Sequence, residues 1–407
     1  MTHLISSDAE ALDVARKLAA SFAVGAAERD RERRLPADEL DELSASGLLG
    51  VTVPREFGGA EVSVATLTEI FRVLAGADAS LAQIPHSHFV FLDALRLQGT
   101  RDQQERFYAE VLAGKRFANA QSERGTRTIA EDATTLTRHG DSPGDSPGGT
   151  YVLTGEKFYC TGALFAHWLV VRATLADEPA GPGGAPRKAL AFVARDTAGI
   201  TVVDDWDGMG QRTTASGTTR LADVRVSTAD VVGYSAIFEG AHTYGSRAQV
   251  LHAALDAGIA RGALEAGVTA VAKARPWFEA GVERAADDPL VVQQAGELEI
   301  TVRGAEALLR SAADAIDAAE RDLTDASTAD ASVATAVAKV AADRAATQVS
   351  AALFELGGTR TAAGALNLSR YWRDARTHTL HDPSRWKVRH VGRWVLDGTP
   401  PPRHGLL

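Results

Sequence analysis

Two pairs of histidines have the spacing of possible metal ligands. His86 and His88 are separated by one residue, and His378 and His381 by two, which would place the second pair on one face of a helix. No cluster of acidic residues stands near either pair to complete a coordination shell. We therefore interpret them as a loop pair and a helix-end pair, and we predict no metal site.

Polar residues gather at three further places where a ligand could bind. Residues 119–125, Asn-Ala-Gln-Ser-Glu-Arg-Gly, lie where helical sequence gives way to strands, and such groups can bind a heteroaromatic ring edge or a phosphate. Residues 157–163 predict a strand with an aromatic pair and a threonine before a glycine turn. An interdomain turn and a buried cross-strand pair explain these two segments equally well. Residues 204–218 are polar, carry one tryptophan and are typical of a ligand-lining loop.

The end of a helix before Pro383 is a fourth candidate, because the residue before a proline disfavours helix. Imidazoles at a helix C-terminus lie at the negative end of its dipole and are readily protonated. His378 and His381 could therefore act as acids and bases. They could also simply cap carbonyl groups, and the sequence leaves both readings open.

Helices must position most of these groups. A serine pair at Ser6 and Ser7 offers an N-cap, and apolar residues at helical spacing continue to about residue 115. Strand-like runs and turns fill about 117–232, and exposed loops are predicted at 140–149 and 177–187. Alanine-rich helices follow at about 246–274, 290–317 and 329–356. A last helix at about 366–375 precedes a tail rich in His, Arg and Trp.

This order predicts a mainly α protein with a central β domain. The expected parts are an N-terminal helical domain (1–117), a β-barrel-like middle domain (118–232) and a C-terminal four-helix bundle (233–407). The 407 residues exceed the roughly 250–300 at which a single core stops growing, which agrees with several domains. No P-loop, His-Glu-x-x-His, Gly-x-Ser-x-Gly or Rossmann glycine fingerprint occurs.

Composition is that of an ordinary globular protein, with 45% hydrophobic and 24% charged residues and a mean hydropathy of -0.10. The net charge of -10 argues against a nucleic-acid partner. No apolar run is long enough for a membrane helix or a signal peptide. The single cysteine, Cys160, excludes an internal disulfide, and we predict a cytoplasmic protein.

Several segments, taken in order, resemble the acyl-CoA dehydrogenase superfamily, which has the same helical–β–helical plan. The matching pieces are residues 53–59, 155–163, 206–217 and 370–376. The dehydrogenases need a glutamate base, and in many members it follows the Arg-Asp-Ala-Arg segment. Here that place holds residues 381–384, His-Asp-Pro-Ser, and the other known place holds Ser246. A base misplaced by about 1 Å can cost about 100-fold, so dehydrogenation is disfavoured.

The closer resemblance is to the flavin-dependent monooxygenase branch, most of all the dibenzothiophene monooxygenase and sulfur-acquisition family. The shared pieces are residues 204–206, 274–277, 288–289 and 376–383. The resemblance implies reduced FMN supplied by a separate NAD(P)H:flavin reductase, O2, and a C4a-hydroperoxyflavin that oxygenates a heteroatom, foremost organic sulfur. Alternatives are an amine N-hydroxylase, an aromatic hydroxylase, an FAD-dependent acyl-CoA dehydrogenase or a non-catalytic binding protein.

The resemblance also assigns residues to the cofactor. The isoalloxazine ring would lie against two segments, with Asn119 and Thr161 as its side-chain partners: Asn119, Ala120, Gln121, Ser122, Glu123 and Arg124, and Lys157, Phe158, Tyr159, Cys160 and Thr161. The ribityl phosphate would meet Ser216, Arg275, Thr359 and Arg360. A neighbouring subunit would supply part of this site, and we expect a homotetramer.

Catalysis and substrate choice are assigned in the same way. Together with Asn119 and Thr161, His381 would be catalytic, because it resembles the histidine near flavin C4a that manages a proton. The substrate pocket would include Ser87, His88 and Trp206; the serine stands where the relatives carry a tyrosine. A bulky planar thiophene is therefore not the expected substrate. Alternation along a strand would turn Cys160 away from Thr161, into the packing.

Overall fold

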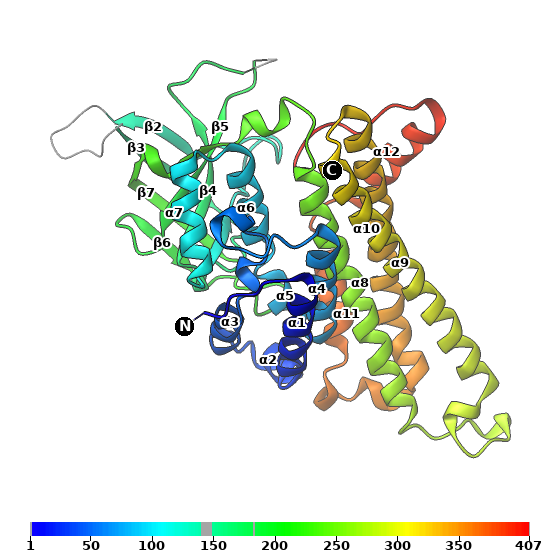
Figure 1. Ribbon diagram of the computed structural model, residues 1–407. Helices are drawn as coiled ribbons and strands as arrows, with labels where there is room; N and C mark the ends of the chain where they lie inside the picture. Colours follow the sequence, from blue (N-terminus) through cyan, green and yellow to red (C-terminus); the bar gives the residue numbers. More distant parts are fainter. Residues whose placement is uncertain (1, 140–148, 182–183, 407) are drawn as a thin grey trace.

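The computed structural model describes residues 2–139, 149–181 and 184–406 and has helical, β and helical parts in that order (Figure 1). This confirms the predicted fold class. Ser7 caps the first helix by accepting a hydrogen bond from the Glu10 amide, as the sequence indicates. The N-terminal helices are α1 (Asp8–Ala23), α2 (Ala26–Glu32), α3 (Ala37–Ala45), α4 (Val64–Ala77), α5 (Ala79–Gln83), α6 (His86–Gln98) and α7 (Arg101–Leu112).

The β part is one mixed sheet in the order β6-β7-β3-β2-β4-β5-β8, with β1 paired parallel to β4. The loop predicted at 140–149 falls between the antiparallel strands β2 and β3, and residues 140–148 lie outside the described residues, as do 182–183 of the second loop. The strands are β1 (Phe117–Ala120), β2 (Thr135–His139), β3 (Thr150–Lys157), β4 (Trp168–Leu175), β5 (Lys188–Ala194), β6 (Ile200–Val203), β7 (Thr218–Ser227) and β8 (Val231–Gly233).

The strand predicted over 157–163 is wrong, because β3 ends at Lys157. Tyr159 is left-handed (φ 56°), and the chain then turns beneath residues 204–217. There the Cys160 amide donates to the Gly217 carbonyl (3.0 Å) and the Gly162 amide to that of Thr214 (3.0 Å). Cys160 is buried, as expected, but through this turn rather than strand alternation. Burial raises the pKa of its thiol to about 12, so it stays neutral.

The C-terminal part contains one helix that the sequence did not indicate. The predicted tail folds as a helix after Pro383 and packs on α10, where the buried Lys387 ammonium binds the Asp382 carboxylate. Its many charges obscure the apolar pattern, and packing on α10 decides its position. The C-terminal helices are α8 (Tyr244–Val271), α9 (Pro289–Arg321), α10 (Asp325–Gly357), α11 (Ser369–His378) and α12 (Ser384–Asp397).

The largest hydrophobic cluster crosses all three parts. It joins N-terminal helices, the inner face of the sheet through Phe192, and α8 through Leu251. The element type changes where β1 begins, at Phe117, and where β8 ends, at Gly233. Because a single core spans these positions, the division into three domains stays a prediction. Among the described residues, no helix combines the length and the apolar character needed to cross a membrane.

Candidate active site

An amide and three hydroxyl groups meet where β1 and β3 end. Asn119 Nδ2 donates to the Tyr159 carbonyl oxygen (3.1 Å). Two residues along the chain, Thr161 Oγ1 lies 2.8 Å from Ser216 Oγ, which lies 2.8 Å from Thr214 Oγ1. The structure therefore brings Asn119, Thr161 and Ser216 together. Amide and hydroxyl groups of this kind can donate to or accept from the polar edge of a heterocycle.

Aromatic side chains border this group. The exposed Tyr159 meets Trp206 edge-on, with ring centroids 6.3 Å apart. Trp206 Nε1 donates to the Gln211 carbonyl (2.9 Å), which fixes the indole. The Arg124 guanidinium covers the ring of Phe158 at 4.3 Å. A flat ligand would find hydrogen-bonding groups and aromatic surface side by side.

Lys157 and Glu123, two charged residues of the predicted ring-binding segments, face inward. Lys157 Nζ binds carboxylate oxygens of Glu123 (2.6 Å) and Asp132 (3.2 Å) and the Gln121 carbonyl (3.1 Å). Burial lowers the pKa of Lys157, although both carboxylates oppose this. These contacts tie the segments together, and Ser122 pairs with Phe158 in an isolated bridge. Two further predicted residues are buried and could meet a ligand only through backbone: Ala120 and Cys160.

The polar cluster contacts the C-terminal helix α11 and the turn between α5 and α6. The Gln211 amide donates to Asp374 Oδ1 of α11 (2.6 Å). A methyl group added at Gly162 would lie 3.1 Å from Ile84, which is two residues before His86. The turn between α5 and α6 therefore lies between Thr161 and the histidines of the C-terminal part.

Four histidines gather behind that turn. His252 of α8 stacks on His86 (centroids 3.9 Å apart) and on His381 (4.1 Å), and its Nδ1 lies 2.9 Å from Nε2 of His378. His378 Nδ1 lies 2.7 Å from Asp256 Oδ1. The sequence singled out three of these histidines but missed His252 and Asp256. Both residues belong to α8, which is buried on nearly every side, and they lie four positions apart in it. Two polar residues at this spacing in an otherwise apolar helix are the sequence signal that could have identified His252 and Asp256.

His381 differs from the other three because its side chain is 41% exposed. Its Nδ1 lies 3.3 Å from Asp382 Oδ1, and the Lys387 ammonium binds the other carboxylate oxygen. Burial opposes ionisation of Asp382, but the His381 hydrogen bond and the Lys387 charge outweigh it and hold the pKa of Asp382 below its usual range. An ionised Asp382 orients His381 with Nε2 as its free nitrogen.

The residues predicted for the substrate pocket are not all brought together. His88 is buried, with Nε2 3.0 Å from the Leu49 carbonyl and Nδ1 accepting from the Phe117 amide (3.1 Å). Both ring nitrogens are thus bound to backbone, and His88 joins α6 to β1 rather than lining an open space. Both histidines lie in the first turn of α6, not in a loop, and Ser87 between them is half-buried.

The predicted phosphate contacts lie in two separate places. Ser216 belongs to the polar cluster, whereas the exposed Arg275 lies in the loop after α8, and the exposed Thr359 and Arg360 begin a short 3-10 helix after α10. Figure 1 shows those helix ends at the far end of the bundle from the sheet. Within the described part of the chain, neither arginine has a carboxylate partner, which leaves both guanidinium groups free to bind an anion.

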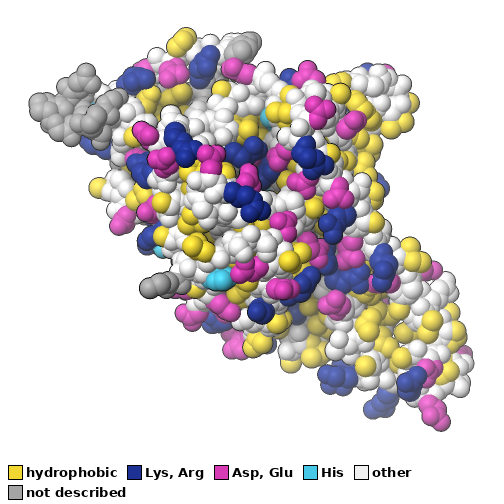
Figure 2. Space-filling model, in the orientation of Figure 1, with side chains coloured by type: hydrophobic (Ala, Val, Ile, Leu, Met, Phe, Trp, Pro, Cys, Tyr) yellow, Lys and Arg dark blue, Asp and Glu magenta, His cyan; other side chains and the backbone are white. Residues whose placement is uncertain are grey.

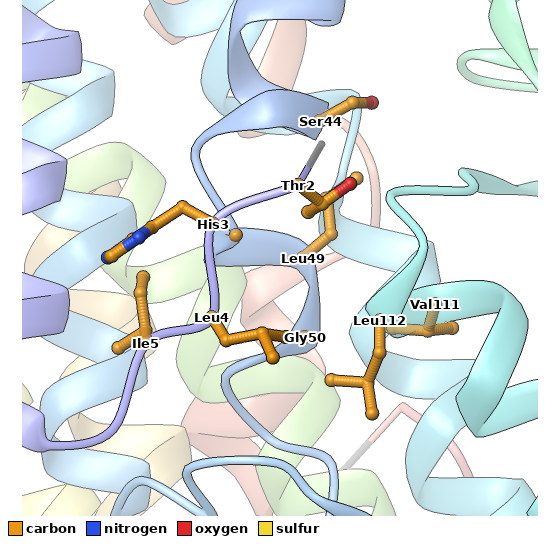
Figure 3. A pocket seen from close by; sticks show the side chains of 10 residues that line it. Thr2, His3, Leu4, Ile5, Ser44, Leu49, Gly50, Val111 and Leu112 are labelled. Carbon is orange, nitrogen blue, oxygen red and sulfur yellow. The ribbon is translucent and has the colours of Figure 1, made fainter.

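Two hollows lie apart from all of these residues. One, of about 10 Å³, has room for about one water beneath the N-terminal segment, beside Ser44 and Leu112 (Figure 3). The other, of about 220 Å³, lies between α4 and α9 and is lined by paired charges such as Arg72 and Glu306. Figure 2 shows acidic and basic side chains interspersed on this face. Neither hollow has the aromatic and hydroxyl lining described above.

Comparison with known proteins identifies the family. The model for the acyl-CoA dehydrogenase N-terminal domain matches residues 7–115, and that for the C-terminal domain matches residues 250–385. A dibenzothiophene monooxygenase of Rhodococcus qingshengii is 33% identical over 97% of this chain and 95% of its own length. The chain belongs to the dibenzothiophene monooxygenase branch of the acyl-CoA dehydrogenase superfamily. This confirms the resemblance drawn from the sequence.

Two further relatives of the same branch match over nearly their full length. A probable FMNH2-dependent monooxygenase, SfnC of Pseudomonas putida, is 32% identical over 96% of each chain. The crystal structure of FMN-bound TdsC from Paenibacillus sp. A11-2 superposes with a TM-score of 0.90 at 33% identity, covering 98% of this chain and 100% of that one.

The donor set of this branch member fits a flavin mononucleotide. The Asn119 amide and the hydroxyls of Thr161 and Ser216 suit the polar ring edge, and the exposed Tyr159 and Trp206 suit its faces. The guanidinium groups without carboxylate partners suit a phosphate. The chemistry of these residues therefore agrees with the resemblance. The ring-edge residues and the arginines that suit the phosphate nevertheless lie far apart within one chain.

Burial keeps the inner histidines of this branch member neutral. It lowers the pKa of His86 to about 3 and that of His88 to about 4. The pKa values of His252 and His378 lie well below the usual 6.5 for the same reason. Burial disfavours the charged form of two carboxyl groups and raises the pKa of Asp343 and of Asp374 to about 7. The negative charge of nearby aspartates raises both pKa values further toward that level.

We expect the protein to lose stability as the pH falls from 6.5 to 5. Below 6.5 the unfolded chain protonates four histidines that the folded chain keeps neutral, while the folded chain protonates two carboxyl groups. The net uptake on unfolding is roughly two protons, about 2.7 kcal/mol per pH unit. Urea-unfolding midpoints at pH 7.5, 6 and 5 measure this. Equal midpoints at pH 7.5 and 5 would contradict the burial of neutral imidazoles.

Proposed function

We propose that this protein is a two-component monooxygenase that takes reduced FMN from an NAD(P)H:flavin reductase and oxygenates the sulfur of an organosulfur compound. The observation that carries the proposal is the exposed His381, oriented by Asp382, where a dehydrogenase of this superfamily would need a carboxylate base. Two relatives that match over nearly their full length, one named dibenzothiophene monooxygenase and one named probable FMNH2-dependent monooxygenase, support it. A cytoplasmic location, where a reductase can supply the flavin, is part of the proposal.

The residues of the chain would share the work as follows. Asn119 and Thr161 hold the ring edge, and Trp206 walls the space beside it. The sequence assigned Ser216 to the phosphate, but its hydroxyl lies 2.8 Å from that of Thr161, so we assign it to the ring edge as well. When bound, reduced FMN reacts with O2 and supplies the oxygen atom. His381 holds or moves a proton at Nε2, because its Nδ1 is held by Asp382.

We also propose that a homotetramer completes the site. The phosphate contacts Arg275 and Arg360 lie at the far end of the bundle from Ser216, so one chain cannot bring them to one ligand without a partner. Large apolar side chains remain exposed on the bundle and can be covered by other copies: Trp277, Phe278, Leu290, Val292, Ile300, Trp386, Val388, Val395 and Leu396. Sedimentation measures the size of the assembly.

Arg275→Ala is expected to weaken FMN binding by about 10- to 100-fold, since a charge-assisted hydrogen bond contributes about 1.5–3 kcal/mol. Riboflavin, which has no phosphate, should bind the variant as well as it binds the wild type. Titrating FMN and riboflavin by fluorescence quenching separates a loss of phosphate binding from a general loss of flavin binding. An equal loss for riboflavin would show that Arg275 acts on the fold and not on the phosphate.

The function is tested with a generic flavin reductase, FMN, NADH and ¹⁸O2. Dibenzothiophene, small sulfides, sulfinates, amines and phenols are supplied in turn, and products are examined by mass spectrometry. Incorporation of ¹⁸O into a sulfur compound, dependent on the reductase, supports the proposal. Labelled products from amines or phenols alone would indicate an N-hydroxylase or an aromatic hydroxylase instead. Turnover of an acyl-CoA without reductase would indicate a dehydrogenase.

A further inference from the structure

The three stacked imidazoles each have one ring nitrogen held by the protein. His86 Nε2 lies 2.9 Å from the Ala248 carbonyl, which only accepts, so this nitrogen carries the proton. His381 Nδ1 is held in the same way by Asp382. His252, in the middle of the stack, is held at Nδ1 by His378. The tautomer of His252 therefore depends on that of His378.

Asp256 settles the tautomer of His378. Its Oδ2 lies 3.0 Å from Lys339 Nζ and its Oδ1 lies 2.7 Å from His378 Nδ1, so both oxygens accept hydrogen bonds. His378 thus carries its proton on Nδ1. Because His378 is buried and neutral, its Nε2 is bare and accepts the Nδ1 proton of His252. Nε2 of His252 is then left without a proton.

That nitrogen has no hydrogen-bond partner among the described residues. His252 is 3% exposed, and its ring lies against that of His381, whose side chain is 41% exposed. A bare imidazole nitrogen next to the exposed His381 is an acceptor for an N–H or O–H group.

We infer that Asp256 and His378 hold His252 in the tautomer whose Nε2 accepts a hydrogen bond, and that His252 is thereby a positioning residue for the group that reacts beside His381. This rests on the proposed function. A proton arriving at Nε2 makes His252 an imidazolium, which can pass its Nδ1 proton to His378, and the Asp256 carboxylate balances the charge. The charged or titratable groups around His252 are His86, Asp256, Lys339, Asp343, His378, His381, Asp382 and Lys387.

Asp256→Asn is expected to reverse the proton positions along His378 and His252 with almost no change in side-chain volume. Lys339 has only donors, so it takes the amide oxygen of the new side chain and turns the NH2 group toward His378. His378 must then accept at Nδ1 and donate from Nε2, and His252 must accept at Nδ1. Nε2 of His252 becomes a donor. Asp343→Asn is the matched control, since it neutralises the other carboxylate on Lys339 and does not touch His378.

The first measurement needs neither flavin nor turnover. Solid-state ¹⁵N spectra of protein labelled at histidine, with the His252 signals assigned by their loss in His252→Gln, report which nitrogen carries the proton. We expect a bare Nε2 in the wild type and in Asp343→Asn, and a protonated Nε2 in Asp256→Asn. A protonated Nε2 in the wild type overturns the inference even where a variant does not fold.

The second measurement is product formed per O2 consumed, followed across pH. We expect a fall of about tenfold or more in Asp256→Asn, with its acid limb moved to lower pH and FMN affinity unchanged. Asp343→Asn should stay close to the wild type. Wild-type coupling in a tautomer-reversed Asp256→Asn, or an equal fall in Asp343→Asn, overturns the positioning role. A wild type that oxygenates nothing contradicts the proposed function, while the flavin-free spectra still decide the tautomer.

Discussion

Replacing His381 with alanine is expected to lower the product formed per O2 consumed by about 100-fold, the typical scale of a positioned acid or base. The O2 that the enzyme still consumes should appear as H2O2. FMN affinity should stay near the wild-type value, because Asn119, Thr161 and Ser216 hold the ring and none of them contacts His381. Peroxide and product are measured together in the reductase-coupled assay.

The control for this variant is His390→Ala. His390 lies on the neighbouring α12, partly buried beside Trp386 (ring centroids 6.2 Å apart), and is not part of the imidazole stack. Its removal should leave the ratio of product to O2 unchanged. Unchanged coupling in His381→Ala would remove His381 from the mechanism, whereas an equal loss in both variants would point to a general disturbance of the C-terminal helices.

Local sequence patterns predicted the order of helices and strands well, because burial on one face leaves a period of 3.6 or 2 residues. They failed where a distant contact decides the backbone. The backbone leaves the strand direction after Lys157, because Tyr159 is left-handed and the turn that follows is hydrogen-bonded to Thr214 and Gly217, more than 50 residues away. The tail after Pro383 forms a helix that is held against α10, an element distant in the sequence.

The candidate site shows the same division. The His-Asp-Pro segment ending at Pro383 pointed to His381, and the structure gives that side chain both exposure and a carboxylate partner. The groups behind it come from α8, α10 and α11, and the Asp256–His378 contact joins residues 122 apart. No local spacing relates such residues. A buried polar group in an otherwise apolar helix, such as Asp256, shows only that some partner must exist.

Lys339→Met should destabilise the protein by about 3–5 kcal/mol at pH 8, which is the cost of leaving a buried charge without its partner. The Lys339 side chain is 1% exposed, and it is the ammonium shared by Asp256 and Asp343. Without it, two buried carboxylates face each other. Arg303→Met is the control, because Arg303 is exposed in its pair with Glu299 and should cost no more than about 1 kcal/mol.

The pH dependence distinguishes this cause from simple loss of packing. Burial and the charge of Asp256 already raise the pKa of Asp343 to about 7, and loss of the ammonium raises it further. A group whose pKa is higher in the folded state adds stability as the pH falls below that value. The defect of Lys339→Met should therefore shrink from pH 8 to pH 6 in urea-unfolding measurements. A defect of the same size at both values would indicate a packing loss, and none at pH 8 would contradict the buried ion pair. Because the same ammonium binds Oδ2 of Asp256, the variant also links the stability of the bundle to the proton arrangement behind His381.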